Sequence, residues 1–333
     1  MPKMFRPKMI LGAVLFALLL SGCSSPSANQ QQTSSELPKT INASYVSRPI
    51  NVPSIVAQDK KLFETEFAKD NIQFKWHDLT TPDSQLEALA SGSLDFANSL
   101  NNLSAILANA NGNDIKVISS YSTFPQGIAL VARANDGISK DADLKGKKIG
   151  LQSGTMLYQM LVEDLAKSNL KENDVTLVNM DSSTALTALL SGQIDATILP
   201  DPLLSKAMAS GKAIKLRTAE GLISGLSVIA VRSDFAQKYP DLVKRFLAVH
   251  KQSLDWSNNN LDQALQLAAA KNQMDIKAVK KMYPEFSFAM SLNEAKQDLI
   301  QSAEFLKKEG MIPSNTDTTK LINDLVDTSF MPR

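Results

Sequence analysis

Residues 86–101 read LEALASGSLDFANSLN, and residues 186–201 read LTALLSGQIDATILPD. The two stretches carry the same residue at six equivalent places, one hundred positions apart. Each reads as the end of an amphipathic helix, a glycine able to take the left-handed conformation, and a short apolar strand. Each is also preceded by a polar turn, at 80–84 and 181–184, that is typical of a helix start. The repetition predicts one supersecondary unit used twice, in two similar lobes.

Polar residues follow both strands of this repeat. Ser99, Asn101 and Asn102 come after the first strand, and Pro200 and Asp201 come after the second. Open parallel α/β sheets bind ligands beyond the carboxyl ends of their strands, where loops and helix N-termini meet. Two such sheet edges facing each other would form a ligand-binding cleft.

Strands and helices alternate through most of the chain, which predicts an α/β protein. In the first series we expect strands at 41–46, 72–76, 94–98 and 115–119, and helices at 52–67, 83–90 and 103–109. A Pro- and Gly-containing segment at 122–127 interrupts the alternation, so we place a crossover between lobes there. In the second series we expect strands at 128–132, 147–151, 175–178, 196–199 and 214–216, and helices at 155–168, 184–190 and 203–209.

A return crossover fits near residues 221–225, before a strand at 228–231. From there the pattern is helical, with helices expected at 235–258, 261–270, 276–282, 292–308 and 318–326. No linker-like segment sets these helices apart, so we expect them to brace the first lobe rather than to form a third domain.

The N-terminus has the layout of a secretory signal, with Lys3, Arg6 and Lys8 before an apolar run at 9–20. That run is too short to span a membrane. The tetrad Leu20-Ser21-Gly22-Cys23 resembles a bacterial lipobox, which implies removal of residues 1–22 and lipidation of Cys23. The alternative is that Cys23 is an ordinary small apolar residue.

The segment after Cys23 contains no charged residue between positions 24 and 35 and is rich in Ser and Gln. Such a composition cannot bury enough apolar surface to fold, so residues 23–37 are expected to be a flexible tether. The chain has one cysteine, which excludes a disulfide within it.

Charge and composition argue against a nucleic-acid partner. Without residues 1–22 the chain has 32 basic residues, three fewer than its total of 35, against 34 acidic ones. It also has only two Trp and five Tyr. No basic stripe or aromatic ladder is therefore available for nucleic acid.

The chain resembles periplasmic-type substrate-binding proteins of ABC importers, in the group for sulfonates, taurine, nitrate and thiamine-precursor pyrimidines. The resemblance covers nearly the whole chain after the signal. It rests on LEALASGSLDFA at 86–97, DLKGKKIGLQSGT at 143–155, LLSGQIDATILPDPLL at 189–204 and VRSDFAQKYPDLVKRFL at 231–247.

The resemblance implies a periplasmic-binding-protein-like type II fold, with two lobes joined by a two-segment hinge. Lobe 1 is then expected at 38–125 plus 226–333, and lobe 2 at 126–225. The resemblance further implies that the lobes close on a small-molecule solute. The closed form is then expected to dock on the permease of a transporter with ATPase subunits. The protein is expected to be a monomer, held by its N-terminal lipid on a membrane facing the periplasm or the cell exterior.

The segment Gln152-Ser153-Gly154-Thr155 follows an expected strand and opens an expected helix. Backbone N–H groups, two hydroxyls and the positive end of the helix would favour an anionic or carbonyl oxygen there. We therefore expect Ser153, Gly154 and Thr155 to contact the ligand. The alternative is a plain N-cap by Ser153 or Thr155.

Ser47 and Arg48 follow the first expected strand. A guanidinium there could hold a sulfonate, carboxylate or phosphate through two parallel hydrogen bonds. The alternative for Arg48 is an ordinary surface position directed outward by Pro49.

Five more residues are candidates for ligand contact. Ser99 and Asn101 follow the first repeat, and Asp201 follows the second, where it would suit a ligand with an N–H or a cationic amine. The pair Asp201-Pro202 also reads as a turn and helix start. Tyr121 and Thr123 lie at the first crossover and could cover a ring, although aromatic residues there are often core.

A metal site and a cofactor are not expected, because no His, Cys and Asp group has ligand spacing. The two histidines, His77 and His250, are expected to be structural or exposed.

We expect a receptor and not an enzyme. Sulfinate desulfinases and pyrimidine-precursor synthases share the fold, but the former need a cysteine nucleophile, and the lone Cys23 lies in the lipobox. A solute-sensing lipoprotein for a signalling partner stays open as an alternative. For the solute, Arg48 and the start at Ser153 favour an anion such as an alkanesulfonate, whereas Asp201 and the crossover aromatics favour a nitrogen heterocycle. We favour the anion slightly.

Overall fold

The structure is a computed structural model that describes residues 36–46 and 51–332. The compact unit Leu37–Arg333 contains all of the described core. No helix of the described residues is long and apolar enough to cross a bilayer. The expected signal peptide, Cys23 and the candidate ligand residues Ser47 and Arg48 lie outside the described residues.

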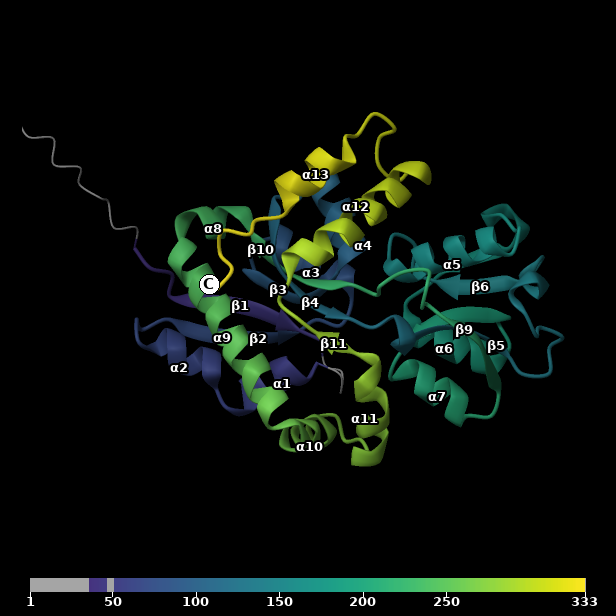
Figure 1. Cartoon of the computed structure of the whole chain (residues 1–333), viewed down its shortest axis with the longest axis horizontal. Helices are drawn as coiled ribbons and strands as arrows, with labels where there is room; N and C mark the ends of the chain where they lie inside the picture. Colours follow the sequence, from purple (N-terminus) through teal and green to yellow (C-terminus); the bar gives the residue numbers. More distant parts are fainter. Residues whose placement is uncertain (1–35, 47–50, 333) are drawn as a thin grey trace, which may run out of the picture. The chain divides into compact units, whose positions relative to one another are not determined.

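The first of the two sheets in the compact unit is mixed, with the order β11-β4-β10-β3-β1-β2 (Figure 1). Strand β1 runs parallel to β2 and β3, whereas β10 is antiparallel to β3 and β4. The strands are β1 (Thr40–Tyr45), β2 (Gln73–Asp78), β3 (Phe96–Asn101), β4 (Ile115–Thr123), β10 (Ser227–Arg232) and β11 (Ser287–Phe288).

Both faces of this sheet are buried under helices, and the strand period of two assigns the side chains to them. Val228 and Ala230 of β10 belong to the core on one face, and Ile229 and Val231 to the core on the other. The helices of this half are α1 (Val52–Asp59), α2 (Leu62–Ala68), α3 (Pro82–Ala90), α4 (Asn102–Ala110), α8 (Ser233–Lys238), α9 (Pro240–Asn259), α10 (Leu261–Lys271), α11 (Ile276–Met282), α12 (Leu292–Lys308) and α13 (Thr318–Leu325).

The second sheet has the order β7-β6-β8-β5-β9, in which β7, β6 and β8 are parallel and β5 is antiparallel to β8. Its strands are β5 (Ile128–Arg133), β6 (Lys148–Leu151), β7 (Thr176–Asn179), β8 (Ala196–Pro200) and β9 (Ala213–Thr218). Its helices are α5 (Met156–Lys167), α6 (Ser182–Ser191) and α7 (Leu203–Ala209). The predicted α/β class is confirmed.

The chain passes from the first sheet to the second after β4 and returns before β10. The two passing segments touch, because the backbone N–H of Phe124 donates to the carbonyl of Ser224 at 3.1 Å. Gly225 allows this approach: it has φ +66°, and a Cβ there would lie 3.2 Å from the carbonyl carbon of Phe124. The two-segment connection has the predicted form, while the residue limits of the two lobes stay a prediction.

The sequence repeat corresponds to a repeated structural unit, formed by α3 and β3 in the first half and by α6 and β8 in the second. The equivalent glycines both have positive φ, +73° at Gly92 and +80° at Gly192. Asp95 Oδ2 then accepts the backbone N–H of Asn42 at 2.8 Å, and Asp195 Oδ2 accepts that of Lys148 at the same distance. Each aspartate thus fixes the start of the neighbouring parallel strand.

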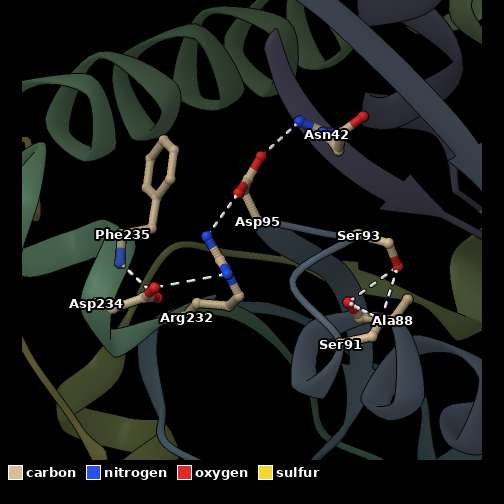
Figure 2. A network of polar contacts seen from close by, with 8 residues as sticks. All are labelled: Asn42, Ala88, Ser91, Ser93, Asp95, Arg232, Asp234 and Phe235. Carbon is tan, nitrogen blue, oxygen red and sulfur yellow. Dashed lines mark hydrogen bonds and ion pairs between the residues drawn. The ribbon is translucent and has the colours of Figure 1, made fainter. Parts of the chain in front are cut away.

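An arginine completes each copy. Arg232 ends β10 and pairs with Asp95 at 3.2 Å, as Figure 2 shows. Arg133 ends β5 and pairs with Asp195 at 3.4 Å. A side chain at Gly92 would meet the guanidinium of Arg232, since an added Cβ would lie 2.8 Å from Nη1. The shared glycine and aspartate are therefore explained by one arrangement built twice.

The expected single helix at 235–258 is two helices, α8 and α9, because Pro240 begins the second one. Proline has no N–H to donate and crowds the preceding turn, so a helix cannot run through it unbroken. The C-terminal helices pack on the first half as expected, and α12 also reaches the second, where Phe305 contacts Tyr158 edge to face at 5.8 Å.

Candidate functional site

A cavity of about 330 Å³ opens where the carboxyl ends of the parallel strands of both sheets meet. Its wall from the first half consists of Val46, Asn51, Thr80, Thr81, Pro82, Gln85, Ser99, Asn101, Ser122, Phe124 and Ser227. Its wall from the second half consists of Gln152, Thr155, Met156, Leu157, Asp181, Ser182, Ser183, Pro200, Pro202, Leu203 and Lys206. The size and the position suit a small organic ligand.

Four helices of nine or more residues begin at this cavity: α3, α4, α5 and α6. The first N–H groups of a helix have no partner within it, and the macrodipole makes this end positive. The cavity is therefore a favourable place for negative charge, provided that some of these N–H groups are still free to donate.

Three of the four helix starts are capped by their own side chains. Thr81 Oγ1 accepts from the backbone N–H of Ser84 at 3.2 Å, and Asn101 Oδ1 accepts from that of Ser104 at 3.2 Å. Asp181 Oδ1 accepts from the N–H of Ser183 at 2.8 Å and from that of Thr184. These helix starts keep only part of their capacity for a ligand.

The start of α5 differs from the other three. Thr155 occupies the N-cap position but makes no side-chain cap, because its Oγ1 donates to the carbonyl of Gln152 at 2.8 Å. Thr155 and the first two helical residues, Met156 and Leu157, all line the cavity. No side chain of the described residues caps this 12-residue helix, so its first turn presents N–H groups to a ligand.

Ser153 and Gly154, which were expected to contact the ligand, have other hydrogen-bond partners in this structure. The N–H of Ser153 donates to Asn179 Oδ1 at 3.0 Å, and the carbonyl of Gly154 accepts from Ser104 Oγ at 3.1 Å. Gly154 has φ +72°, and a Cβ there would lie 3.2 Å from Leu107, so glycine permits α4 to approach this turn. Neither residue is part of the cavity wall.

Of the described candidates, Ser99, Asn101 and Thr155 line the cavity. Asp201 does not: it is 2% exposed, and its Oδ1 accepts from the N–H of Ser205 at 2.9 Å. Thr123 lines a separate, smaller cavity of about 100 Å³. Direct roles in binding stay predictions for all of these residues.

Tyr121 lies in the core of the first half, not at the cavity wall. It is 1% exposed, its hydroxyl shares a hydrogen bond with Ser54 at 2.8 Å, and its ring lies 5.3 Å from that of His250. Burial raises the pKa of this hydroxyl and lowers the pKa of His250 to about 4. His250 is thus a buried, neutral structural residue, one of the two roles expected for it.

Gln85 is a cavity residue that the sequence did not single out. It is 2% exposed and held from two sides: its Oε1 accepts from Ser44 Oγ at 3.0 Å, and its Nε2 donates to the carbonyl of Leu79 at 3.2 Å. An amide nitrogen carries two hydrogens, so one stays available for a ligand. The polar turn at 80–84 was the signal, because it predicts a helix start and thereby a first turn at the cleft.

Charged side chains are few in the described part of the wall, where Lys206 is basic and Asp181 is acidic. Hydrogen bonds from the side chain and backbone of Thr184 lower the pKa of Asp181, so it is ionised at neutral pH. Its Oδ2 accepts from Thr184 Oγ1 in addition to the two backbone bonds at Oδ1. Asp181 is engaged as a helix cap, which leaves it little capacity for a cationic ligand group.

The two halves touch beside the cavity. Gln152 Nε2 donates to Asp83 Oδ2 at 2.7 Å, which joins the turn before α5 to the first turn of α3. The bond from Ser104 Oγ to the carbonyl of Gly154 joins α4 to the same turn. The turn before α5 is therefore in contact with two helices of the first half, α3 and α4.

Comparison with known proteins agrees with this arrangement. A protein of Bacillus subtilis (strain 168), named as an aliphatic sulfonates-binding protein, is 28% identical over 330 residues, which is 97% of this chain and 95% of the relative. The taurine-binding periplasmic protein of Escherichia coli (strain K12) is 25% identical over 292 residues, 83% of this chain and 89% of the relative.

Solved structures show the same fold. The alkanesulfonate-binding protein SsuA from Xanthomonas axonopodis pv. citri, bound to MOPS, superposes with a TM-score of 0.77 at 21% identity, over 88% of this chain and 99% of that one. A Candida albicans gene product with the generic periplasmic binding protein fold superposes with a TM-score of 0.74 at 18% identity, over 89% of this chain and 98% of that one. The family model described as NMT1/THI5 like matches residues 51–264. This chain belongs to the NMT1/THI5-like family and has the periplasmic-binding-protein fold.

Proposed function

We propose that this chain is the solute-binding receptor of an ABC importer and that its solute is a small organic anion, with an alkanesulfonate favoured. The observation that carries the proposal is the uncapped start of α5 at a cavity where three other helices also begin. Several N–H groups and partial positive charges are thereby directed at one anionic group. The sulfonate- and taurine-binding relatives are consistent with this solute class.

The apolar part of the wall supports an organic anion over a bare inorganic one. Val46, Phe124, Met156, Leu157 and Leu203 line the cavity together with three prolines. Apolar walls of this kind bury the carbon chain of a ligand, while a few polar groups orient its head. A short alkyl sulfonate has both an apolar chain and a polar head, whereas nitrate has no apolar part to bury.

The carboxylates argue against a solute whose binding depends on an amine. Asp201 is buried and is not part of the cavity wall, and Asp181 is engaged in capping α6. In the described wall no other carboxylate is available to pair with an ammonium group. We therefore expect an alkanesulfonate without an amine to bind more tightly than taurine.

The remaining parts of the proposal concern the cellular setting. The protein is exported, lipidated at Cys23 and anchored to a membrane facing the periplasm or the cell exterior. There it acts as a monomer, closes on the solute and delivers it to the permease and ATPase subunits, without chemistry of its own. The signal layout and lipobox at the N-terminus support the export and the anchor.

Thermal denaturation of residues 36–333 with a ligand panel tests the solute. The panel holds ethanesulfonate, butanesulfonate, taurine, nitrate, butyrate and a pyrimidine. Binding to the folded state alone stabilises it by about 2.7 kcal/mol at one hundred times Kd. We expect a concentration-dependent rise in Tm with the alkanesulfonates and a smaller one with taurine. A rise with the pyrimidine alone would contradict the anion assignment.

A further inference from the structure

Two carboxylic acids meet where the second half contacts the C-terminal part of the chain. Asp201 lies between β8 and α7. Glu285 ends the short 3₁₀ helix Tyr283–Glu285, directly before β11, which pairs with β4 in the first sheet. Both residues pack against Gly127, and the Asp201 carboxyl group lies within hydrogen-bond reach of the Glu285 carboxyl group, so this contact joins the second half to an element of the first half.

The surroundings hold both groups in place. The backbone N–H of Asp201 donates to the carbonyl of Gly127 at 2.8 Å, and its side chain caps Ser205. A Cβ on Gly127 would lie 2.9 Å from the ring of Phe286 and 3.5 Å from Glu285 Oε2. Glycine at this crossover position therefore lets the segment carrying Glu285 pack closely against the second half.

Oε2 of Glu285 is buried and has no N–H or O–H partner among the described residues. Two ionised carboxylates cannot donate to each other, so a hydrogen bond between them requires one proton held by the pair. A buried oxygen without a partner is also a poor place for a full negative charge. Both features favour a pair that carries one proton and one negative charge.

The charges around the pair act in both directions. Burial raises the pKa of Glu285, and the neighbouring Asp201 raises it further, to about 7. Lys215 on β9 and Lys281 on α11 act against this rise. Lys206 on α7 is the basic group on the helix that Asp201 precedes, and it lines the cavity. The proton of the pair is then gained or lost near neutral pH.

We propose that Asp201 and Glu285 share one proton across the contact between the two halves, and that this proton makes solute binding depend on pH. The inference rests on the proposed receptor function. The link to the solute is short, because Pro200 and Pro202, the residues on either side of Asp201, both line the cavity. A group that holds Asp201 in place therefore also holds part of the cavity wall.

The direction follows from the proton. Below neutral pH the pair is protonated, and its hydrogen bond holds the Pro200–Pro202 segment against the first half. As the pH rises through about 7, the proton leaves and two like charges repel. Without the contact, Glu285 has its ordinary pKa of 4.5 and loses its proton first. The stability that the contact adds is therefore lost as the pH rises from about 4.5 to about 7. Solute affinity and folding stability both fall with rising pH.

Two measurements on residues 36–333 test the proposal between about pH 5 and about pH 8. The first is calorimetric titration with butanesulfonate, the anion of a strong acid, which does not itself change charge in this range. The second is urea unfolding without ligand. Both compare the wild type with Glu285→Gln, which keeps the shape and can donate to Asp201 at every pH. Glu87→Gln, at an exposed position on α3, is the matched control.

We expect the wild type and Glu87→Gln to lose about tenfold or more in affinity and in the folding equilibrium constant over this range, relative to Glu285→Gln. If Glu285→Gln does not fold, Asp201→Asn replaces it, because asparagine can still cap Ser205 while the shared proton is removed. Equal pH profiles for wild type and variant would overturn the shared proton.

The two arms separate this inference from the proposed function. A pH-dependent stability with a pH-independent affinity would overturn the link to the solute. An absence of butanesulfonate binding at every pH would count against the proposed solute class, and the unfolding arm would then decide by itself whether the proton is shared.

Discussion

At the scale of single residues, the repeated Asp–Arg pairs explain why a sequence echo survives across two halves with different ligand-facing residues. Asp95 is 5% exposed, and burial raises its pKa although Asn42 donates to it and Arg232 lies beside it. Its charge is therefore costly to bury, and the two partners offset that cost. The Asp–Arg pairs themselves bind no ligand in the proposed function; they set the register of the strands that carry the cavity residues.

Removal of this carboxylate should destabilise the protein. In Asp95→Ala the N–H of Asn42 and the guanidinium of Arg232 both lose a buried acceptor, which costs about 2 kcal/mol of unfolding free energy. Asp255→Ala is the control, because its pair with Lys251 is exposed and contributes about 0.5 kcal/mol or less. Urea denaturation at neutral pH measures both. Equal losses in the two variants would contradict the structural role of Asp95.

His250 should make the protein sensitive to mild acid. Burial lowers its folded-state pKa to about 4, below the ordinary value of 6.5. The unfolded chain therefore binds the proton more tightly, and stability is lost as the pH falls below about 6.5. Between about pH 7 and about pH 4.5, the wild type should lose about 2 to 3 kcal/mol more than His250→Phe. Urea unfolding at the two pH values measures this, and parallel losses would show that the imidazole is not responsible.

At the scale of elements, the four helices of nine or more residues that begin at the cavity differ in how their first turns are capped. In α3, α4 and α6 the N-cap side chain accepts a hydrogen bond from the first turn, whereas the first turn of α5 has no such cap and lies at the cavity. Capping and ligand binding compete for the same N–H groups. A cap introduced at α5 should therefore improve the helix and weaken the site.

Thr155→Asp tests this competition. An aspartate at the N-cap stabilises a helix by about 1 kcal/mol, but its charge would occupy the place of the anionic head group. We expect unchanged or higher Tm without ligand and at least about tenfold weaker butanesulfonate binding, since each 1.4 kcal/mol changes affinity tenfold. Thr155→Asn caps without charge and should lose less affinity. If both variants bind like the wild type, the anion does not lie at α5.

The sequence predicted elements well wherever local pattern decides them. Helices α11 and α12 begin and end at the predicted residues, because their apolar spacing is complete within each helix. Strand β11 was missed, since two residues, Ser287 and Phe288, become a strand only through pairing with β4. Periodicity is local information, and strand pairing is not.

The same limit applies to the candidate site. The carboxyl ends of the strands were predicted from topology, and Ser99, Asn101 and Thr155 do line the cavity. Which side of a strand or turn a residue faces depends on packing, so Tyr121 and Asp201 lie beneath the surface of the site instead. Gln85 was missed because its place in the first turn of α3 matters only once that turn reaches the cavity.

At the scale of the whole molecule, closure should depend on a balance between contacts beside the cavity and the solute within it. The bond between Gln152 and Asp83 is exposed, and exposed polar contacts contribute little. The bond between Ser104 and Gly154 is buried but single. A ligand that touches both halves adds to the contacts between them, so it shifts the population toward the form in which the halves are together.

Small-angle scattering of residues 36–333 measures that shift. With saturating butanesulfonate the radius of gyration should fall, because the solute adds contacts with both walls that exist only when the halves are together. Asp83→Ala should raise the radius of the ligand-free protein and weaken binding by less than about tenfold, since it removes one exposed contact. A radius that stays constant while butanesulfonate raises the Tm would mean that the solute binds a cavity already closed, and the proposed closing motion would then have to be abandoned although the binding function remained.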